Sequence, residues 1–182
     1  MLRKPLALIA LLLLSQLAFA QQTAEPVTTV FLIRHAERAD EPRQDPPLTA
    51  KGVARSEALA RLLSTAGVKA IYTSQFARTK LTAEPLAKQL GVTATAISLK
   101  ISPANPRAIA EESTKETVDK ILSHAGGSVL VVGHSNSIPD VIKMLGGDVV
   151  PTIDEKKFDD LFVVTVYGNG KAKVTHLKYG TE

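Results

Sequence analysis

Two short apolar runs, each followed at once by a histidine, are the feature that most constrains the fold. Residues 27–33 lead into Arg34 and His35, and residues 128–132 lead into a glycine and His134. Runs of this length, rich in β-branched and aliphatic residues, are typical of strands buried on both faces of a parallel sheet. Ligand sites in open parallel sheets lie beyond the carboxyl ends of the strands. We therefore expect both imidazoles to stand at one sheet edge, with the Arg34 guanidinium beside them.

The remaining chain alternates strand signals with helix signals. Helical segments lie between the first four expected strands, as right-handed βαβ crossovers require. The sequence Gly-Asn-Gly at 168–170 suits a tight hairpin between the last two strands. We predict an α/β fold, a three-layer αβα sandwich with a largely parallel central sheet and an antiparallel edge hairpin. The expected strands are 27–33, 69–73, 92–98, 128–132, 160–167 and 171–177.

The first two helices have clear boundary signals. The first is expected over residues 48–66, with Thr49 as a capping residue and Gly67 as the stop. The second is expected over residues 75–90, with an interruption at Pro85, because proline lacks the N–H that a helix interior needs.

The next two helices are predicted from their caps. Residues 113–116 read Ser-Thr-Lys-Glu, a capping-box pattern that is expected to start the third helix. Its apolar residues Val118, Ile121 and Leu122 are expected to be buried. Ser137 is expected to cap a shorter fourth helix.

The beginning of the chain is typical of a signal peptide. Arg3 and Lys4 form a basic start, an apolar run follows, and residues 18–20 fit a small-x-small cleavage site. We expect residues 1–20 to be removed, which would leave residues 21–182 as one domain in the periplasm or the medium, free of the membrane. A retained anchor is the alternative, although the apolar run is short for a membrane span.

Composition removes several classes of site. The chain has no cysteine, which excludes disulfides, thiolate chemistry and sulfur-ligated zinc. The formal net charge is +4, and the leader supplies two of the 22 basic residues and none of the 18 acidic ones. So small an excess, without basic clusters or stacking aromatic residues, argues against nucleic acid as a partner. Any anion-binding function must be local.

A third cationic side chain is expected at the same sheet edge. Arg78 follows the strand at 69–73 and lies one turn into the next helix, where the helix dipole favours a bound anion. Phosphoryl transfer spreads negative charge over three oxygens, which arginine matches with bidentate hydrogen bonds. A histidine kept neutral by neighbouring cations can attack phosphorus through its free ring nitrogen. The hypothesis is a phosphoryl site made of Arg34, His35, Arg78 and His134.

Four motifs follow one another along the chain. They are Arg-His-Ala-Glu at 34–37, Pro-Leu-Thr at 47–49 with Gly52, Ser-x-x-x-Arg-x-x-x-Thr-Ala at 74–83, and Gly-His-Ser at 133–135. In this order and spacing they resemble the histidine phosphatase superfamily, which has the phosphoglycerate-mutase-like fold. The resemblance covers essentially the whole chain after the leader, so residues 21–182 are expected to form one histidine phosphatase domain.

The resemblance also implies roles for individual residues. His35 would be the nucleophile that forms a phosphohistidine, and Arg34, Arg78 and His134 would complete the phosphate pocket. Arg38 matches an arginine that part of the superfamily places after the nucleophile motif. Neither a metal nor another cofactor is implied. Small members that this chain resembles include phosphohistidine phosphatases, so the expected partner is a small phosphorylated substrate or a phosphohistidine protein.

The chain departs from the family where a general acid is expected. The mutase-like branch supplies a glutamate shortly after the third strand, but residues 99–105 contain no carboxylate. The acid-phosphatase branch places an aspartate after the second histidine, where this chain has Ser135. A poor leaving group needs such a proton, whereas a phosphoramidate, acyl phosphate or anhydride departs more readily without it. The proton donor stays unassigned, and selectivity is expected from loops 39–46 and 100–107.

Other interpretations of the same residues stay open. His35, Glu37 and His134 could form a two-histidine, one-carboxylate metal site, although nearby guanidinium groups repel a divalent cation. Glu37 could be a catalytic acid, but its expected role is that of a loop carboxylate that is either solvated or paired with an arginine. The pocket could also capture a phosphorylated ligand without turnover, or transfer a phosphoryl group as a mutase does. Ser135 is not expected to be a hydrolase nucleophile, because the Gly-x-Ser-x-Gly elbow is absent.

Overall fold

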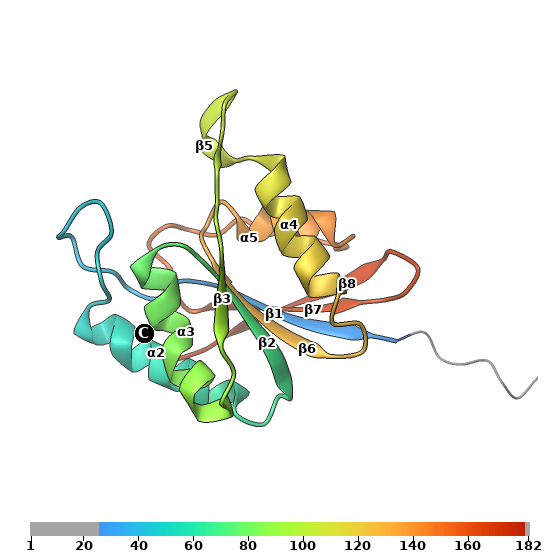
Figure 1. The fold of residues 1–182 in the computed structure, drawn as a ribbon, viewed down its shortest axis with the longest axis horizontal. Helices are drawn as coiled ribbons and strands as arrows, with labels where there is room; N and C mark the ends of the chain where they lie inside the picture. The colour runs from blue at the N-terminus through green and yellow to red at the C-terminus, as the bar shows by residue number, and fades with distance from the viewer. Residues whose placement is uncertain (1–25, 181–182) are drawn as a thin grey trace, which may run out of the picture.

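A mostly parallel six-stranded sheet forms the centre of the molecule (Figure 1). The computed structural model describes residues 26–180, so the expected signal peptide lies outside the described residues. The strand order is β3-β2-β6-β1-β7-β8, in which the first four strands pair in parallel, β7 pairs antiparallel with β1, and β8 pairs antiparallel with β7. The predicted fold class is therefore confirmed. The strands are β1 (Thr28–Arg34), β2 (Val68–Ser74), β3 (Ala94–Ile97), β6 (Ser128–Gly133), β7 (Asp160–Val166) and β8 (Ala172–Lys178).

Two helices cover each face of the sheet and seal two apolar cores (Figure 1). Leu59 and Leu86 of the first pair of helices pack with Ile33 and Ile71 of the strands. Ile121 belongs to the core under the second pair. Among residues 26–180, no helix is both long and apolar enough to cross a membrane. The first pair is α2 (Ala50–Leu63) and α3 (Ala77–Leu90), and the second is α4 (Glu111–Leu122) and α5 (Ile138–Met144).

The ends of the first two helices largely follow the predictions. Thr49 caps α2, because its hydroxyl accepts the N–H of Gly52 at 3.1 Å. The predicted interruption of α3 at Pro85 is wrong, since α3 runs through it unbroken. Ala83 and Leu86, on either side of the proline, are fully buried. Their packing holds both halves of the helix against the sheet.

The predicted capping box of α4 is also wrong. The helix begins at Glu111, and the Ser113 hydroxyl instead accepts the N–H of Lys100 and donates to the carbonyl of Ser98. Ser113 therefore ties the helix to the segment after β3. The predicted burial of Leu122 fails as well, because this side chain is 47% exposed at the last turn.

The segment expected to be a loop at 100–107 is part of a short hairpin. β4 (Ile101–Ser102) pairs with β5 (Asn105–Ile109), and the hairpin projects beyond α4 at the top of Figure 1. Its strands are too short and too polar to give a strand signal in the sequence. Asn136, in the loop after β6, donates its side-chain N–H to the carbonyl of Arg107. The hairpin is thereby attached to the turn that follows His134.

The backbone of the connection from β1 to α2 lies in close contact with Gly52. The Glu37 carbonyl accepts the N–H of Thr49 at 2.9 Å, and a Cβ atom built on Gly52 would lie 2.2 Å from that carbonyl oxygen. No real Cβ contact is so short. A glycine at this position is therefore required for the close approach of the β1–α2 connection to the helix.

We predict that Gly52→Ala destabilises the protein by about 1–3 kcal/mol through overpacking. Helix propensity alone would give the opposite sign, since alanine in a helix interior is favoured over glycine by roughly 1 kcal/mol. Urea denaturation measures the difference. Glu57→Ala, on an exposed part of the same helix, is the control and should change stability by less than about 0.5 kcal/mol. A Gly52→Ala protein as stable as the wild type would contradict the close contact.

Candidate active site

The two histidines meet because β1 and β6 are adjacent, parallel and in register. Arg34 lies opposite Gly133, and the backbone N–H of His35 donates to the Gly133 carbonyl at 3.0 Å. The His35 and His134 ring centroids are 5.3 Å apart, at an interplanar angle of 64°. Both residues are more than nine-tenths buried. The structure thus brings the two predicted site histidines together at the carboxyl edge of the sheet.

His35 has a defined tautomer. Its Nδ1 lies 2.8 Å from the carbonyl oxygen of Ala36, and a carbonyl can only accept, so Nδ1 carries the proton. Burial, followed by the charges of Arg34, Arg78 and Arg38, lowers the pKa of His35 to about 4 and outweighs the opposing effect of the Ala36 carbonyl. The ring is therefore neutral near pH 7. Its Nε2 keeps a lone pair.

Arg34 holds a segment before β7 against the site. One terminal nitrogen, NH1, donates to the carbonyls of Asp154 and Lys157, and its guanidinium lies 4.3 Å from the centroid of the Phe158 ring. The same Phe158 ring lies 5.9 Å from that of His35. The Nε atom of Arg34 is buried and has no hydrogen-bond partner among the described residues. A buried guanidinium donor without a partner is what an anion site requires.

Arg78 stands at the beginning of α3, beside a carboxylate. Its guanidinium lies 4.3 Å from the centroid of the Phe76 ring, and its NH1 is 3.9 Å from an oxygen of Asp45. The two Asp45 oxygens accept the Ala77 N–H at 2.8 and 3.1 Å. Asp45 therefore attaches the expected selectivity loop, residues 39–46, to the N-terminus of α3. It is a carboxylate at the pocket margin that the sequence prediction did not single out.

Arg38 lies farther out than the other predicted site residues. Its side chain is exposed and NH1 donates to the Ala39 carbonyl. Its charge still contributes to lowering the pKa of His35. Arg38 is thus within electrostatic reach of the pocket but at its rim.

His134 is held by two serine hydroxyls. Its Nε2 lies 2.9 Å from the Ser74 hydroxyl oxygen, and its backbone N–H donates to the Ser137 hydroxyl at 2.9 Å. Ser137 therefore stands at the start of α5 but binds the histidine turn rather than capping the helix, which corrects its predicted role. Burial, then the charges of Arg78, His35 and Arg34, lower the pKa of His134 to about 3. This second imidazole is neutral as well.

Glu37 is paired with an arginine, which is one of the two structural roles expected for it. Arg55 of α2 donates from Nε and NH2 to the Glu37 carboxylate at distances between 2.9 and 3.1 Å, and from NH1 to the carbonyl of Tyr179. Burial alone would raise the pKa of Glu37, but the hydrogen bonds from Arg55 outweigh it and keep this pKa below the ordinary value. Sequence reasoning missed Arg55, because its partners lie 18 and 124 residues away along the chain.

The alternative of a metal site finds no support in this geometry. The Glu37 carboxylate is engaged by Arg55, and no group of three His, Asp or Glu residues within the described range could hold a metal ion.

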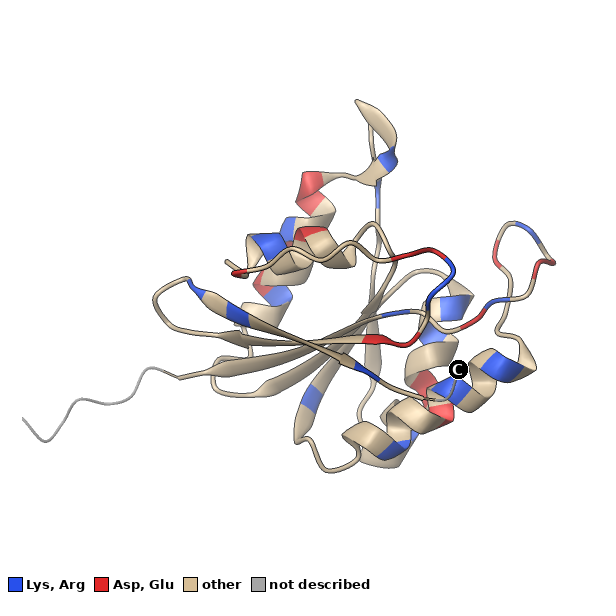
Figure 2. Ribbon diagram, turned by 180° about the vertical axis from the view of Figure 1, so that it is seen from behind, with Lys and Arg blue, Asp and Glu red and all other residues tan. Residues whose placement is uncertain are grey.

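Lys, Arg, Asp and Glu positions are interspersed over helices and loops (Figure 2). The concentrated positive charge at the sheet edge is therefore a local feature of the arginines around His35.

The comparisons with known proteins agree with this geometry. The family model for the histidine phosphatase superfamily (branch 1) matches residues 30–99. No protein of curated function matches the chain in sequence. A phosphoglycerate mutase from Bacillus anthracis str. Sterne superposes with a TM-score of 0.65 at 20% identity, over 86% of this chain and 95% of that one.

Two phosphatases of known structure have the same fold. The protein histidine phosphatase SixA, complexed with tungstate, gives a TM-score of 0.64 at 18% identity, over 82% of this chain and 96% of that one. A mycobacterial glucosyl-3-phosphoglycerate phosphatase gives 0.61 at 12% identity, over 86% and 100%. At these identities the likeness establishes the fold over nearly the whole length of each relative.

We predict that Arg55→Met lowers the free energy of unfolding by about 3 kcal/mol, because it removes the hydrogen-bonded cation of the mostly buried Glu37 carboxylate and leaves it the longer contact, at 3.8 Å, with the largely exposed Lys51. Urea denaturation near pH 7 measures the loss. Arg43→Met is the matched control, since it breaks an ion pair with Glu41 that is largely exposed and should cost less than about 1 kcal/mol. Equal effects of the two substitutions would contradict a structural role for the Glu37–Arg55 pair.

Proposed function

We propose that this chain is a phosphatase of the histidine phosphatase superfamily, whose family model matches residues 30–99, and that it hydrolyses a phosphorylated substrate through a phosphohistidine on His35. The proteins of similar structure include two phosphatases and a mutase, and what these enzymes share is a reaction at a phosphoryl group. The observation that carries the proposal is the hydrogen bond from His35 Nδ1 to the Ala36 carbonyl. This bond places the proton of the neutral ring on Nδ1 and so leaves the lone pair on Nε2, which supports a role for His35 as the nucleophile.

The reaction follows from this tautomer. Nε2 attacks phosphorus, a P–N bond forms, and the bond to the leaving group breaks with its electron pair on the leaving atom. Water then attacks the phosphorus of phosphohistidine, which releases inorganic phosphate and restores the imidazole. Arg34, Arg78 and His134 would stabilise the phosphoryl oxygens during both steps, with Arg38 contributing charge from the rim. No metal or other cofactor enters the proposed reaction.

The proposed setting is the periplasm or the medium, on the strength of the signal-peptide pattern in residues 1–20. The substrate would be a small phosphorylated molecule or a phosphohistidine protein. Hydrolysis is favoured over mutase chemistry, because a mutase must retain the phosphoryl group and serves intracellular metabolites. The selectivity loop at 39–46 is attached beside Arg78 through Asp45, a position that supports a role in substrate choice.

We predict that the wild type releases phosphate from p-nitrophenyl phosphate or from a phosphoramidate, and that His35→Ala abolishes both turnover and covalent labelling. Acid-labile labelling of the trapped protein, located by mass spectrometry, measures the phosphohistidine. His124→Ala is the control, because His124 bonds to Tyr72 and belongs to none of the predicted site residues. Phosphate binding without turnover on either substrate would favour a binding module, and labelling without release to water would favour a mutase.

We predict an unusual titration for His35. Burial, and after it the nearby arginine cations, disfavours the imidazolium form and lowers the pKa of His35 to about 4, so the ring should stay neutral down to about pH 5. Arg78→Met removes one of these cations and should therefore raise the pKa of both His35 and His134. NMR titration of the histidine ring signals provides the measurement. A wild-type His35 that titrates near 6.5, the ordinary value, would contradict the electrostatic description of the site.

A further inference from the structure

Two buried hydroxyl groups form a chain behind His134. The Ser74 oxygen lies 2.9 Å from His134 Nε2 and 2.9 Å from the hydroxyl oxygen of Thr79, in the first turn of α3. Ser74 is 3% exposed and Thr79 is fully buried. Both groups are therefore shielded from bulk solvent. We refer to Ser74 and Thr79 together as the hydroxyl relay.

The direction of the hydrogen bonds in the relay follows from the acceptors around it. The Thr79 hydroxyl has one hydrogen and three acceptors in reach: the Ser74 hydroxyl oxygen and the carbonyls of Ser74 and Phe76. The Phe76 carbonyl already accepts the backbone N–H groups of Thr79 and Lys80, and the Ser74 carbonyl is farther away, at 3.2 Å. The Thr79 hydrogen is thus available to the Ser74 oxygen. Ser74 can then pass its own hydrogen to Nε2 of His134.

The other ring nitrogen of His134 is left for a ligand. Within the described part of the chain, Nδ1 has no hydrogen-bond partner, and it is not among the fully buried unpartnered atoms. An unprotonated phosphoryl oxygen carries no hydrogen, so it can only accept a hydrogen bond from an imidazole. The ring could donate as a cation, but the burial and the arginine charges that lower the pKa of His134 to about 3 oppose this form. A neutral ring can donate from Nδ1 only if Nε2 accepts.

We propose that the hydroxyl relay delivers a hydrogen bond to Nε2 of His134 and so keeps the single proton of the neutral ring on Nδ1, where it binds a phosphoryl oxygen. Ser74 and Thr79 are positioning residues in this arrangement, because they act through the imidazole and do not touch the substrate. The relay rests on the proposed function in one respect, since it requires a phosphoryl group in the pocket.

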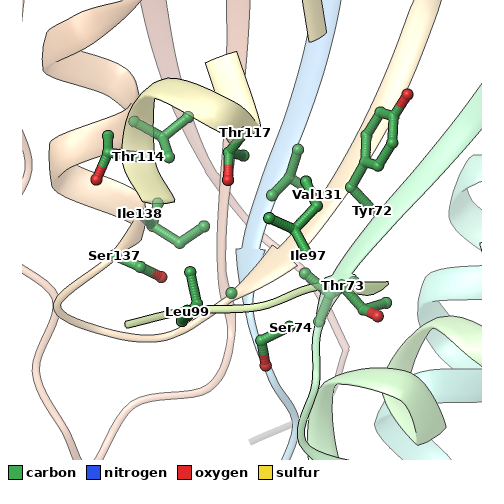
Figure 3. A pocket seen from close by; sticks show the side chains of 13 residues that line it. Tyr72, Thr73, Ser74, Ile97, Leu99, Thr114, Thr117, Val131, Ser137 and Ile138 are labelled. Atoms are coloured by element: carbon green, nitrogen blue, oxygen red, sulfur yellow. The ribbon is translucent and has the colours of Figure 1, made fainter. Parts of the chain in front are cut away.

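The neighbouring threonine provides a matched control. Thr73 precedes Ser74 on β2 and is equally buried, but its hydroxyl oxygen has no partner among the described residues. Both residues line a small cavity of about 20 Å³ beside Ser137 (Figure 3). Replacing Thr73 with valine therefore removes a buried hydroxyl from the lining of the same cavity and leaves both hydroxyls of the relay in place.

Nitrogen-15 NMR of ring-labelled protein saturated with inorganic phosphate tests the tautomer directly. The expected result near pH 7 is a protonated Nδ1 and an unprotonated Nε2 in His134, the reverse of a ring that donates to Ser74. A His134 signal with the proton on Nε2, or with both nitrogens protonated, would overturn the relay. A wild type that binds no phosphate would overturn both the relay and the proposed phosphoryl pocket.

Phosphate affinity of variants tests the role of each hydroxyl. Ser74→Ala should weaken phosphate binding about tenfold, the scale of one lost buried hydrogen bond. Ser74→Thr should restore much of the affinity, because it keeps a hydroxyl, and Thr79→Val should weaken binding through the loss of the donor to Ser74. Thr73→Val should bind as the wild type does. Equal affinities for Ser74→Ala and Thr73→Val, with both proteins folded by thermal melting, would overturn the proposal.

Discussion

The parallel pairing of β1 with β6 is the constraint on which the site depends. Because Arg34 lies opposite Gly133, the residues that follow the two strands emerge at the same height above the sheet. A shift of one residue would send alternate side chains to the opposite face and separate the two imidazoles. The register is itself fixed by burial, since Leu32 of β1 and Val132 of β6 are completely covered. The apolar core thus determines the geometry of the polar site.

A second set of contacts holds the loop that carries His35. The backbone N–H of Ala36 donates to the Thr82 hydroxyl of α3, while Glu37 meets α2 through Gly52 and Arg55. The loop that follows β1 is therefore held between two helices that cover the same face of the sheet. Residues from the other three sequence motifs, far apart along the chain, thus contact this one short loop: Thr49 donates to the Glu37 carbonyl, Thr82 accepts from Ala36, and Gly133 accepts from His35.

The sequence predicted what short-range patterns encode. Buried strands are recognisable as runs of consecutive apolar residues, so the central sheet could be predicted. Because His35 and His134 each follow such a run, their contact could be predicted as well. Features set by long-range contacts could not: Arg55 finds its partners across 18 and 124 residues, and Ser113 gave a capping signal but serves the segment after β3. Ser74 was visible in a motif, yet its role depends on a distance to His134 that no spacing reveals.

In the candidate site, the arginines carry the positive charge and the two histidines are neutral. Burial and the arginines keep both imidazoles uncharged, so positive charge resides on guanidinium groups that do not titrate near neutral pH. Each imidazole then contributes a hydrogen-bond donor and a lone pair at fixed positions, rather than a charge. The Ala36 carbonyl holds the proton of the neutral His35 ring on Nδ1, which leaves the lone pair on Nε2, and the Ser74 hydroxyl is placed to donate to Nε2 of His134, which would leave its proton on Nδ1. In each ring, the hydrogen bond made by one nitrogen thus determines whether the other nitrogen carries a proton or a lone pair.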